Sequence, residues 1–330
     1  MFLDKANNIL VVRFSSLGDI LLTTPVLRAL ANKYIGVKVD YIVKRQYEDA
    51  LKHNPSINKL YSFEEKEPSP ELIAELRRNS YDFVVDLQSS GRSKKFVEEL
   101  AMRTYSYVKP TLNKIMLVNF KFNLYKKVKQ IPEMYAEAVP NLTLDDKGLE
   151  LFIPNEIKPI LQERGEYIGI SPGSKHYTKR WLPEYFAELG GMLNKAGYIV
   201  VIFGGRDDKE ICNNINGKVE NSINLCNDDK LLQTAADMKM CKAIVCNDSG
   251  MMHTASAVGV PFVALFGSTV KQFGFFPYKA QSLVLENKSL SCRPCSHIGK
   301  SSCPKEHFKC MRDLTPELDY NNLISFISNK

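Results

Sequence analysis

Short apolar runs that alternate with helical patterns are the feature that most constrains how this chain folds. The runs 8–14, 37–43 and 83–86 occupy the first part of the sequence, and the runs 167–171, 198–203, 243–246 and 261–266 occupy the second. Strands that are apolar along their whole length are typical of parallel sheets covered by helices on both faces. The sequence therefore predicts an α/β protein with two doubly wound parallel sheets.

The alternation pauses near 154–159, a short stretch that begins and ends with proline. We therefore expect one domain over residues 1–155 and another over residues 160–330, a division that suits a chain of 330 residues. The last segment, 316–329, has amphipathic spacing that would allow a helix to pack back across the first domain.

Composition and charge narrow the class of protein. No apolar run approaches the roughly 20 residues needed to cross a bilayer, and the N-terminus lacks the features of a signal peptide. We therefore expect a soluble, cytoplasmic protein. The net charge is +7, but residues 91–130 hold ten Lys and Arg against two Glu, so this stretch should face either an anionic partner or water.

Polar clusters follow several of the predicted strands. In open α/β sheets, ligands bind beyond the carboxyl ends of the strands, where loops enter helix N-termini. In the first cluster, residues 13–19, Gly18 permits a tight turn and Asp19 supplies a carboxylate. Asp19 has two interpretations, a helix-capping acid or a general base.

The second cluster, residues 171–181, combines small residues, hydroxyls and bases after a predicted strand. Backbone N–H groups near Gly173 and Ser174, with the charge of Lys179 or Lys175, suit a diphosphate. A solvated basic loop is the alternative. Gly204, in a Gly-Gly pair after the next strand, is a weaker candidate because such pairs mostly mark turns.

The third cluster, residues 246–253, lies where a strand gives way to a helix. Ser249 and Gly250 would present N–H groups to a phosphate, Asp248 would accept from sugar hydroxyls, and His253 would follow one turn inside the helix. Taken singly, Asp248 suits a helix cap and His253 a packed side chain. Their combination favours a ligand site.

The motifs RFSSLGDILLTTPVLRAL, ISPGSKHYTKRW, VIFGGRDD and CNDSGMMHTASAVGVPFVALFGST occur in this order along nearly the whole chain. Together they resemble glycosyltransferase family 9, the bacterial heptosyltransferases of lipopolysaccharide assembly. The resemblance implies a GT-B fold, in which two Rossmann-like domains face a central cleft. It also implies inverting transfer of a heptose from ADP-heptose to a lipopolysaccharide core acceptor, with no catalytic metal.

The resemblance also assigns roles to residues. Asp19 matches the catalytic acidic residue that deprotonates the acceptor hydroxyl, and Lys179 matches the lysine that contacts the donor phosphates. The partners implied are an ADP-sugar and a lipid-linked phosphorylated sugar, with peripheral contact at the inner membrane surface. The predicted donor-binding set is Gly18, Ser171, Gly173, Ser174, Lys175, Gly204, Asp248, Ser249, Gly250 and His253.

A cysteine-rich segment, residues 290–315, contains Cys292, Cys295, Cys303 and Cys310. Four thiols within nineteen residues, opening with a CxxC pair, suit a structural zinc or iron site. Reduced thiols or disulfides are the alternative. The segment resembles one found in some family members, especially second-heptose enzymes.

Three other functions are compatible with parts of the pattern: a GT-B nucleotide-sugar 2-epimerase, a transferase for another nucleotide sugar, and a nucleic-acid-binding module. Aromatic residues among the bases of 91–130 favour a transferase that meets a phosphorylated, lipid-linked sugar near an anionic membrane. The isoelectric point near 8.8 is low for a nucleic-acid-binding module, and no dedicated motif is present, so we expect no nucleic acid partner.

Overall fold

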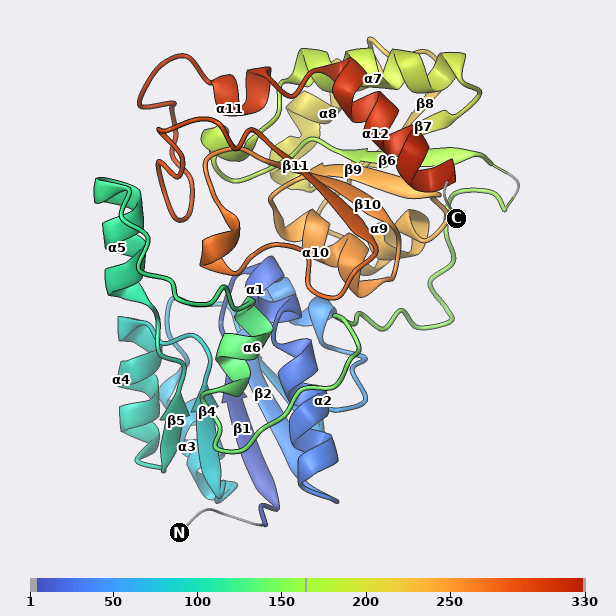
Figure 1. The fold of residues 1–330 in the computed structure, drawn as a ribbon. Helices are drawn as coiled ribbons and strands as arrows, with labels where there is room; N and C mark the ends of the chain where they lie inside the picture. Colours follow the sequence, from blue (N-terminus) through green and yellow to red (C-terminus); the bar gives the residue numbers. More distant parts are fainter. Residues whose placement is uncertain (1–4, 164, 329–330) are drawn as a thin grey trace. The chain divides into compact units, whose positions relative to one another are not determined.

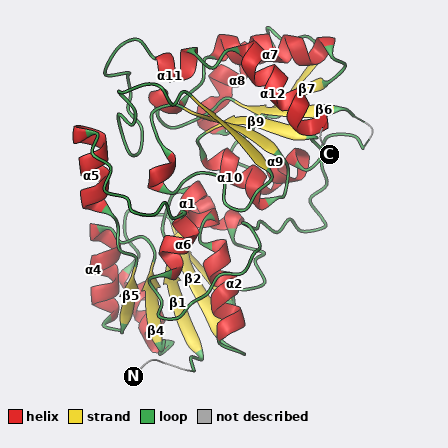
Figure 2. Ribbon diagram, in the orientation of Figure 1, coloured by secondary structure: helices red, strands yellow, loops and turns green. Residues whose placement is uncertain are grey.

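The computed structural model describes residues 5–163 and 165–328, which form two compact units, each built on one sheet (Figure 1). The first unit comprises the chain up to Pro110 together with Lys129–Phe152. The second comprises Thr111–Val128 and the chain from Ile153 onward. Both sheets are parallel and carry helices, as Figure 2 shows, so the predicted α/β class with two parallel sheets is confirmed.

The first unit has a five-stranded sheet in the order β3-β2-β1-β4-β5. The order reverses between β1 and β4, and this switch point is where open parallel sheets place ligands. Its strands are β1 (Asn8–Val12), β2 (Lys38–Lys44), β3 (Lys59–Phe63), β4 (Phe83–Asp86) and β5 (Thr104–Ser106). Its helices are α1 (Leu17–Leu21), α2 (Thr24–Lys33), α3 (Pro70–Arg78), α4 (Gly91–Leu100) and α6 (Ile131–Ala136), with the 3₁₀ helix η1 (Arg45–Ala50).

The second unit has a six-stranded sheet in the order β11-β10-β9-β6-β7-β8. Its strands are β6 (Tyr167–Ser171), β7 (Ile199–Ile202), β8 (Ser222–Asn224), β9 (Ala243–Asn247), β10 (Phe262–Phe266) and β11 (Ser282–Glu286). Its α-helices are α5 (Thr111–Phe120), α7 (Pro183–Lys195), α8 (Lys209–Asn216), α9 (Leu231–Met238), α10 (Gly250–Ala257), α11 (Lys309–Arg312) and α12 (Pro316–Ser328). Its 3₁₀ helices are η2 (Tyr177–Lys179), η3 (Arg206–Asp208) and η4 (Lys271–Phe273).

The second sheet is buried on both faces. Val200 and Ile202 join the core cluster that contains Trp181, whereas Val201 and Phe203 join the cluster on the opposite face. Successive strand residues point to opposite faces, so covering both faces requires apolar residues at consecutive positions. This is why these strands read as continuous apolar runs in the sequence.

The chain leaves the first unit at Pro110 and returns at Lys129. Residues 111–128 therefore belong to the second unit, whereas the sequence placed them in a first domain of residues 1–155. The side chain of Lys121 fixes this segment, because its Nζ donates to the carbonyl oxygens of Cys292 (3.1 Å) and Pro294 (2.5 Å).

The C-terminal helix packs within the second unit. Helix α12 contacts α7, where Leu323 is fully buried and Ile324 and Ile327 extend the same core cluster. Its apolar side chains complete the second unit's own core, and packing of this helix on the first domain stays a prediction. Among the described residues, no helix is long and apolar enough to span a membrane.

Candidate functional site

The turn after β1 holds Asp19 in a network of polar contacts. One carboxylate oxygen, Oδ2, accepts from the hydroxyl of Ser16 at 2.7 Å and from the Ser16 backbone N–H at 3.3 Å. The other, Oδ1, lies 2.8 Å from the guanidinium of Arg13, and the Asp19 side chain keeps a fifth of its surface exposed. Asp19 is thus a first-turn acid of α1, as one interpretation of the sequence held, and it also remains accessible to a ligand.

Arg13 positions this carboxylate from the end of β1. Its Nη1 and Nε donate to the carbonyl oxygens of Leu87 and Ser15, each at 2.7 Å. Burial alone would lower the pKa of Arg13, but the adjacent Tyr135 and the Asp19 carboxylate raise it above its ordinary value. Arg13 therefore stays cationic and holds Asp19 beside the β1–β4 switch point.

Asp86, at the end of β4, stabilises the neighbouring loop. It accepts from the backbone N–H groups of Gln88 and Ser89 and from the Ser93 hydroxyl, each at 2.9 Å. Burial raises the pKa of Asp86 despite these hydrogen bonds. Gln88 in turn accepts from the Phe14 N–H at 3.1 Å, so the loops after β1 and β4 are tied together.

In the second unit, Lys179 and Asp248 form an ion pair of 2.7 Å. Asp248 follows β9 and is almost fully buried, and its Oδ2 also accepts from the Thr269 hydroxyl at 2.7 Å. Lys179 ends η2, after β6, so residues 69 positions apart meet at the carboxyl edge of one sheet. A partly exposed cation held beside a turn is suited to neutralise an anionic ligand.

Hydrogen bonds fix the loop that presents Lys179. Asn247 accepts from the Trp181 N–H at 2.9 Å and donates to the Pro172 carbonyl at 2.8 Å, which links both ends of the loop to β9. Arg180 Nε donates to the Ser174 carbonyl at 2.5 Å. The loop is therefore held in place before any ligand arrives.

Two hydroxyls near this loop, those of Ser171 and Ser249, are buried and have no hydrogen-bond partner among the residues that the structure describes. Ser249 is the N-cap residue of α10, and its side chain makes no capping bond. Buried hydroxyls usually find a partner, and a helix N-terminus favours anions. The start of α10 therefore has the chemistry of a phosphate site.

The other predicted donor residues fall into three groups. Ser174, Gly250 and the buried His253 lie in the loop or helix of this site, and Ser174 Oγ approaches the Asp248 carbonyl at 3.5 Å. Lys175 is exposed. Gly18 lies in α1 and therefore belongs to the first unit, whereas this site is built on the sheet of the second unit.

Both loop glycines have packing reasons. A Cβ on Gly204 would lie 2.7 Å from the sulfur of Cys212, a residue of α8. Glycine at this position therefore allows α8 to pack close to the end of β7. A Cβ on Gly173 would lie 2.3 Å from the Asp208 carboxyl group. Asp208 therefore packs directly on the loop, and burial raises the pKa of its side chain.

Several residues that build these sites could not be assigned a role from sequence. Arg13 interrupts an otherwise apolar run, and a charged residue there is the signal that would have marked it. Thr269 follows β10, the strand beside β9, so its position was readable only once strand order was known. Arg180, Asn247 and Asp208 act through contacts that spacing does not reveal.

The family model described as "Glycosyltransferase family 9 (heptosyltransferase)" matches residues 70–305, more than half of the chain. The chain belongs to glycosyltransferase family 9. The predicted family is thereby confirmed.

A curated relative within the family is lipooligosaccharide heptosyltransferase 2 of Campylobacter jejuni, 30% identical over 210 residues. This match covers 60% of the chain and 64% of the relative, so it spans less than two thirds of the relative's length. Lipooligosaccharide heptosyltransferase 2 of Haemophilus ducreyi is 24% identical over 339 residues, covering 94% of the chain and 96% of the relative.

Solved structures share the fold. A family 9 glycosyl transferase from Veillonella parvula has a TM-score of 0.81 at 24% identity, covering 98% of both chains. The ADP-heptose lipopolysaccharide heptosyltransferase II of Escherichia coli has a TM-score of 0.75 at 23% identity, covering 98% of this chain and 99% of the other. These likenesses confirm the predicted fold class.

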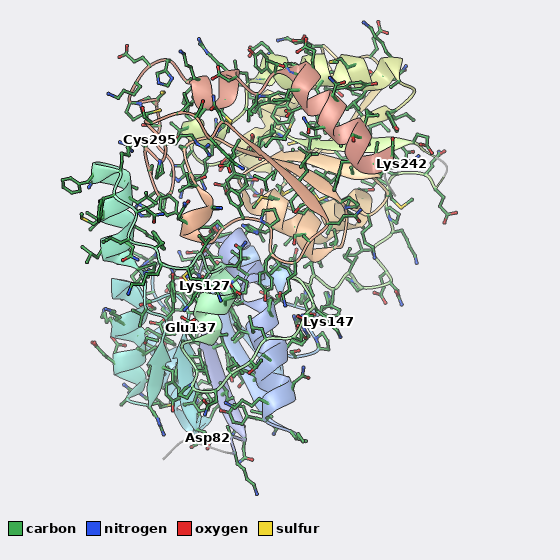
Figure 3. The ribbon with its side chains drawn as sticks, in the orientation of Figure 1. Asp82, Lys127, Glu137, Lys147, Lys242 and Cys295 are labelled. Carbon is green, nitrogen blue, oxygen red and sulfur yellow. The ribbon has the colours of Figure 1, made fainter. Side chains whose placement is uncertain are left out.

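The cysteine-rich segment of this family 9 chain lies between β11 and α12, where Figure 3 labels Cys295. Its four thiols are free. The pKa of the Cys310 thiol is raised to about 12, mainly because the thiol is buried and also because the Cys295 thiol lies nearby. Within residues 5–163 and 165–328, no group of three or more His, Cys, Asp or Glu side chains is arranged to hold a metal ion. As arranged, the thiols therefore do not fit a metal.

The same segment braces the second site. The Lys300 N–H donates to the Thr178 hydroxyl at 2.8 Å, and the Thr178 N–H donates to the Lys300 carbonyl at 3.1 Å. Thr178 immediately precedes Lys179. The cysteine-rich segment thus supports the loop that presents the lysine.

Proposed function

We propose that this chain transfers a heptose from ADP-heptose to a lipopolysaccharide core acceptor, with inversion at the anomeric carbon. The observation that carries the proposal is the second-unit site, where a lysine paired with a buried aspartate lies beside a helix N-terminus with an uncapped serine. Family membership and the names of the relatives supply the sugar and the nucleotide.

We assign donor binding to the second unit. The diphosphate accepts from the N–H groups at the start of α10 and from the hydroxyl of Ser249, and Lys179 supplies the positive charge. As the bond between the sugar and ADP breaks, charge grows on the departing phosphate and Lys179 stabilises it. Asp248, held by Thr269, keeps Lys179 in position.

We assign proton transfer to the first unit. The acceptor hydroxyl oxygen bonds to the anomeric carbon on the face opposite ADP, ADP departs with the bonding electron pair, and Asp19 takes the hydroxyl proton. Arg13 holds the carboxylate in position, while a fifth of the Asp19 side-chain surface stays exposed. The transfer routes no step through a metal ion.

The acceptor in this reaction is anchored to lipid, so the protein transfers the sugar at the cytoplasmic surface of a membrane. An epimerase or a transferase for another nucleotide sugar would use the same donor chemistry, because the second-unit site recognises phosphate. Family membership favours transfer of heptose over both.

The deciding experiment incubates the purified chain with ADP-heptose and heptose-acceptor lipopolysaccharide core, and follows product by mass spectrometry. We expect a mass gain of one heptose and release of ADP. Parallel reactions replace ADP-heptose with UDP- and GDP-sugars, and omit the acceptor. Donor isomerised without acceptor would show an epimerase, and product from a UDP- or GDP-sugar alone would reassign the donor.

A further inference from the structure

Exposed apolar side chains concentrate in one short segment of the second unit. The described residues expose thirteen large apolar side chains, and six of the thirteen lie between Thr111 and Val128. Phe120 and Phe122 have 68% and 58% of their surface exposed. These six are Leu112, Ile115, Phe120, Phe122, Leu124 and Val128. Scattered surface apolar residues are ordinary, but such a concentration marks an interaction surface.

The segment is held at its base. Leu117 is buried, and Lys121 Nζ donates to the Val118 carbonyl at 2.9 Å as well as to Cys292 and Pro294. In Figure 1, α5 is drawn as a separate helix, away from the second unit's sheet. The fold therefore presents the apolar side chains outward on an anchored segment.

The charge of the segment identifies the partner. Residues 111–128 contain no Asp or Glu and four lysines, Lys114, Lys121, Lys126 and Lys127. Lys126 and Lys127 are exposed, and Figure 3 labels Lys127. Lysine is depleted from protein–protein interfaces, so a second copy of the chain is a poor occupant. Lysines beside aromatic and aliphatic side chains are typical of helices that lie on anionic bilayers.

We propose that residues 111–128 dock the second unit onto an anionic phospholipid surface. Phe120 and Phe122 enter the boundary between headgroups and acyl chains, and Lys126 and Lys127 contact the anionic headgroups. Ten residues of α5 extend only about 15 Å, half the thickness of the hydrocarbon core, so the helix lies on the surface. The inference deepens the proposed function, on which it rests for a lipid-anchored acceptor, but lipid binding itself requires no sugar transfer.

The test is co-flotation of the full chain with vesicles of phosphatidylethanolamine and phosphatidylglycerol, against phosphatidylcholine vesicles. We expect at least about tenfold tighter binding to the anionic vesicles, weakened by salt. The double variant Phe120→Ser/Phe122→Ser should weaken binding about tenfold or more, because burial of phenyl surface is lost. Lys126→Glu/Lys127→Glu should weaken it by a similar factor and remove the salt dependence.

Matched controls come from the first unit. Ile35 has 97% of its surface exposed, and Ile35→Ser removes an exposed apolar side chain outside the segment. Lys38→Glu/Lys52→Glu reverses two exposed charges there. Both should bind vesicles as the wild type does. A Phe120→Trp probe should shift its emission to the blue and be quenched by brominated lipid, because the native Trp181 is buried.

Three results would overturn the proposal. The first is equal binding of the wild type to neutral and anionic vesicles. The second is vesicle binding by the segment variants that is as tight as binding by the control variants. The third is a wild-type protein that does not bind vesicles but forms a dimer in sedimentation velocity, which Phe120→Ser/Phe122→Ser dissociates. The last result would assign the surface to a second copy. Vesicle binding without heptose transfer would contradict only the proposed function, and transfer to a detergent-solubilised acceptor without vesicle binding would contradict only this inference.

Discussion

Each unit has a carboxylate beside a cation at the carboxyl edge of its sheet, but the two pairs are built differently. Asp19 is partnered by residues within six positions of it, Arg13 and Ser16, and keeps a fifth of its surface exposed. Asp248 is 4% exposed, and its partners come from other loops of the sheet. An accessible acid suits proton transfer, whereas a buried one suits positioning of Lys179. We therefore expect variants of Asp19 to affect turnover, and variants of the Lys179–Asp248 pair to affect binding and stability.

The largest effect should come from Asp19→Asn. The amide cannot take the acceptor proton, so turnover should fall by about 10²–10⁴, the usual contribution of a general base, while donor affinity stays nearly constant. Steady-state kinetics and calorimetry with ADP-heptose measure both. Ser16→Ala, which removes only the 2.7 Å hydroxyl contact, is the matched control. Turnover near wild type in a folded Asp19→Asn protein would reduce Asp19 to a helix-capping acid.

The second prediction concerns Lys179→Ala, which leaves Asp248 charged, buried and without its cation. We expect the free energy of unfolding to fall by about 3–5 kcal/mol, as for other buried pairs broken on one side. Donor binding and transfer should also weaken, because the diphosphate loses a charge-assisted contact. Urea denaturation and calorimetry provide the readouts, with Lys195→Ala as an exposed control. If neither quantity changes, the two pairs do not differ as proposed.

A third carboxylate sharpens the comparison because it pairs with no cation among the described residues. Asp319, in α12, is fully buried, both its oxygens lack a hydrogen-bond partner among the described residues, and burial raises its pKa to about 8. In the unfolded chain this carboxyl ionises near pH 4. Its contribution to stability is therefore greatest below about pH 4 and is lost as the pH rises through 8.

Asp319→Asn cannot ionise, so its advantage over the wild type should grow between pH 5 and pH 9. The folded and unfolded pKa values differ by about 4 units, each worth about 1.4 kcal/mol, so we expect a difference of roughly 5 kcal/mol at the upper end. Thermal unfolding at several pH values measures the difference. A pH-independent difference would mean that Asp319 has the same pKa folded and unfolded.

The smallest effect concerns the cysteine-rich segment, which braces the second site through Thr178. The prediction from sequence is one structural zinc or iron ion per chain, held by Cys292, Cys295, Cys303 and Cys310. Elemental analysis of protein purified without a metal-affinity step tests it, and less than about a tenth of an equivalent would favour free thiols, as the arrangement of the described residues does. If metal is bound, removing it should increase hydrogen exchange in 290–315 and leave ADP-heptose binding largely unchanged.

The sequence predicted central strands better than edge strands. β1, β6, β9 and β10 lie inside their sheets and appear as apolar runs because both faces are covered. β3, β5 and β11, which are three of the four edge strands, were missed, and β5 and β11 have no fully buried residue. Edge strands bury less side-chain surface, so their composition resembles that of loops.

The candidate sites show the same division. Asp19 and Lys179 could be found because each follows a recognisable strand and lies in a family motif. Their partners could be found only in part. Arg13 and Ser16 are neighbours of Asp19 in sequence, but the pairing of Asp248 with Lys179 and Thr269 depends on strand order. Spacing along the chain does not encode that order.

The excursion of residues 111–128 into the second unit has a consequence for synthesis. The side chain of Lys121 donates hydrogen bonds to carbonyl groups that are synthesised 171 and 173 residues later. A ribosome adds about 5–20 residues per second, so this delay lasts roughly 10–30 s. Once Phe152 has been synthesised, the first unit has all of its own chain. The apolar, basic segment 111–128 still lacks the carbonyl groups that its Lys121 side chain contacts in the folded protein. Midway through translation, the apolar side chains of residues 111–128 are therefore exposed on a segment that is not yet anchored. A chaperone or a nearby bilayer would contact this segment first.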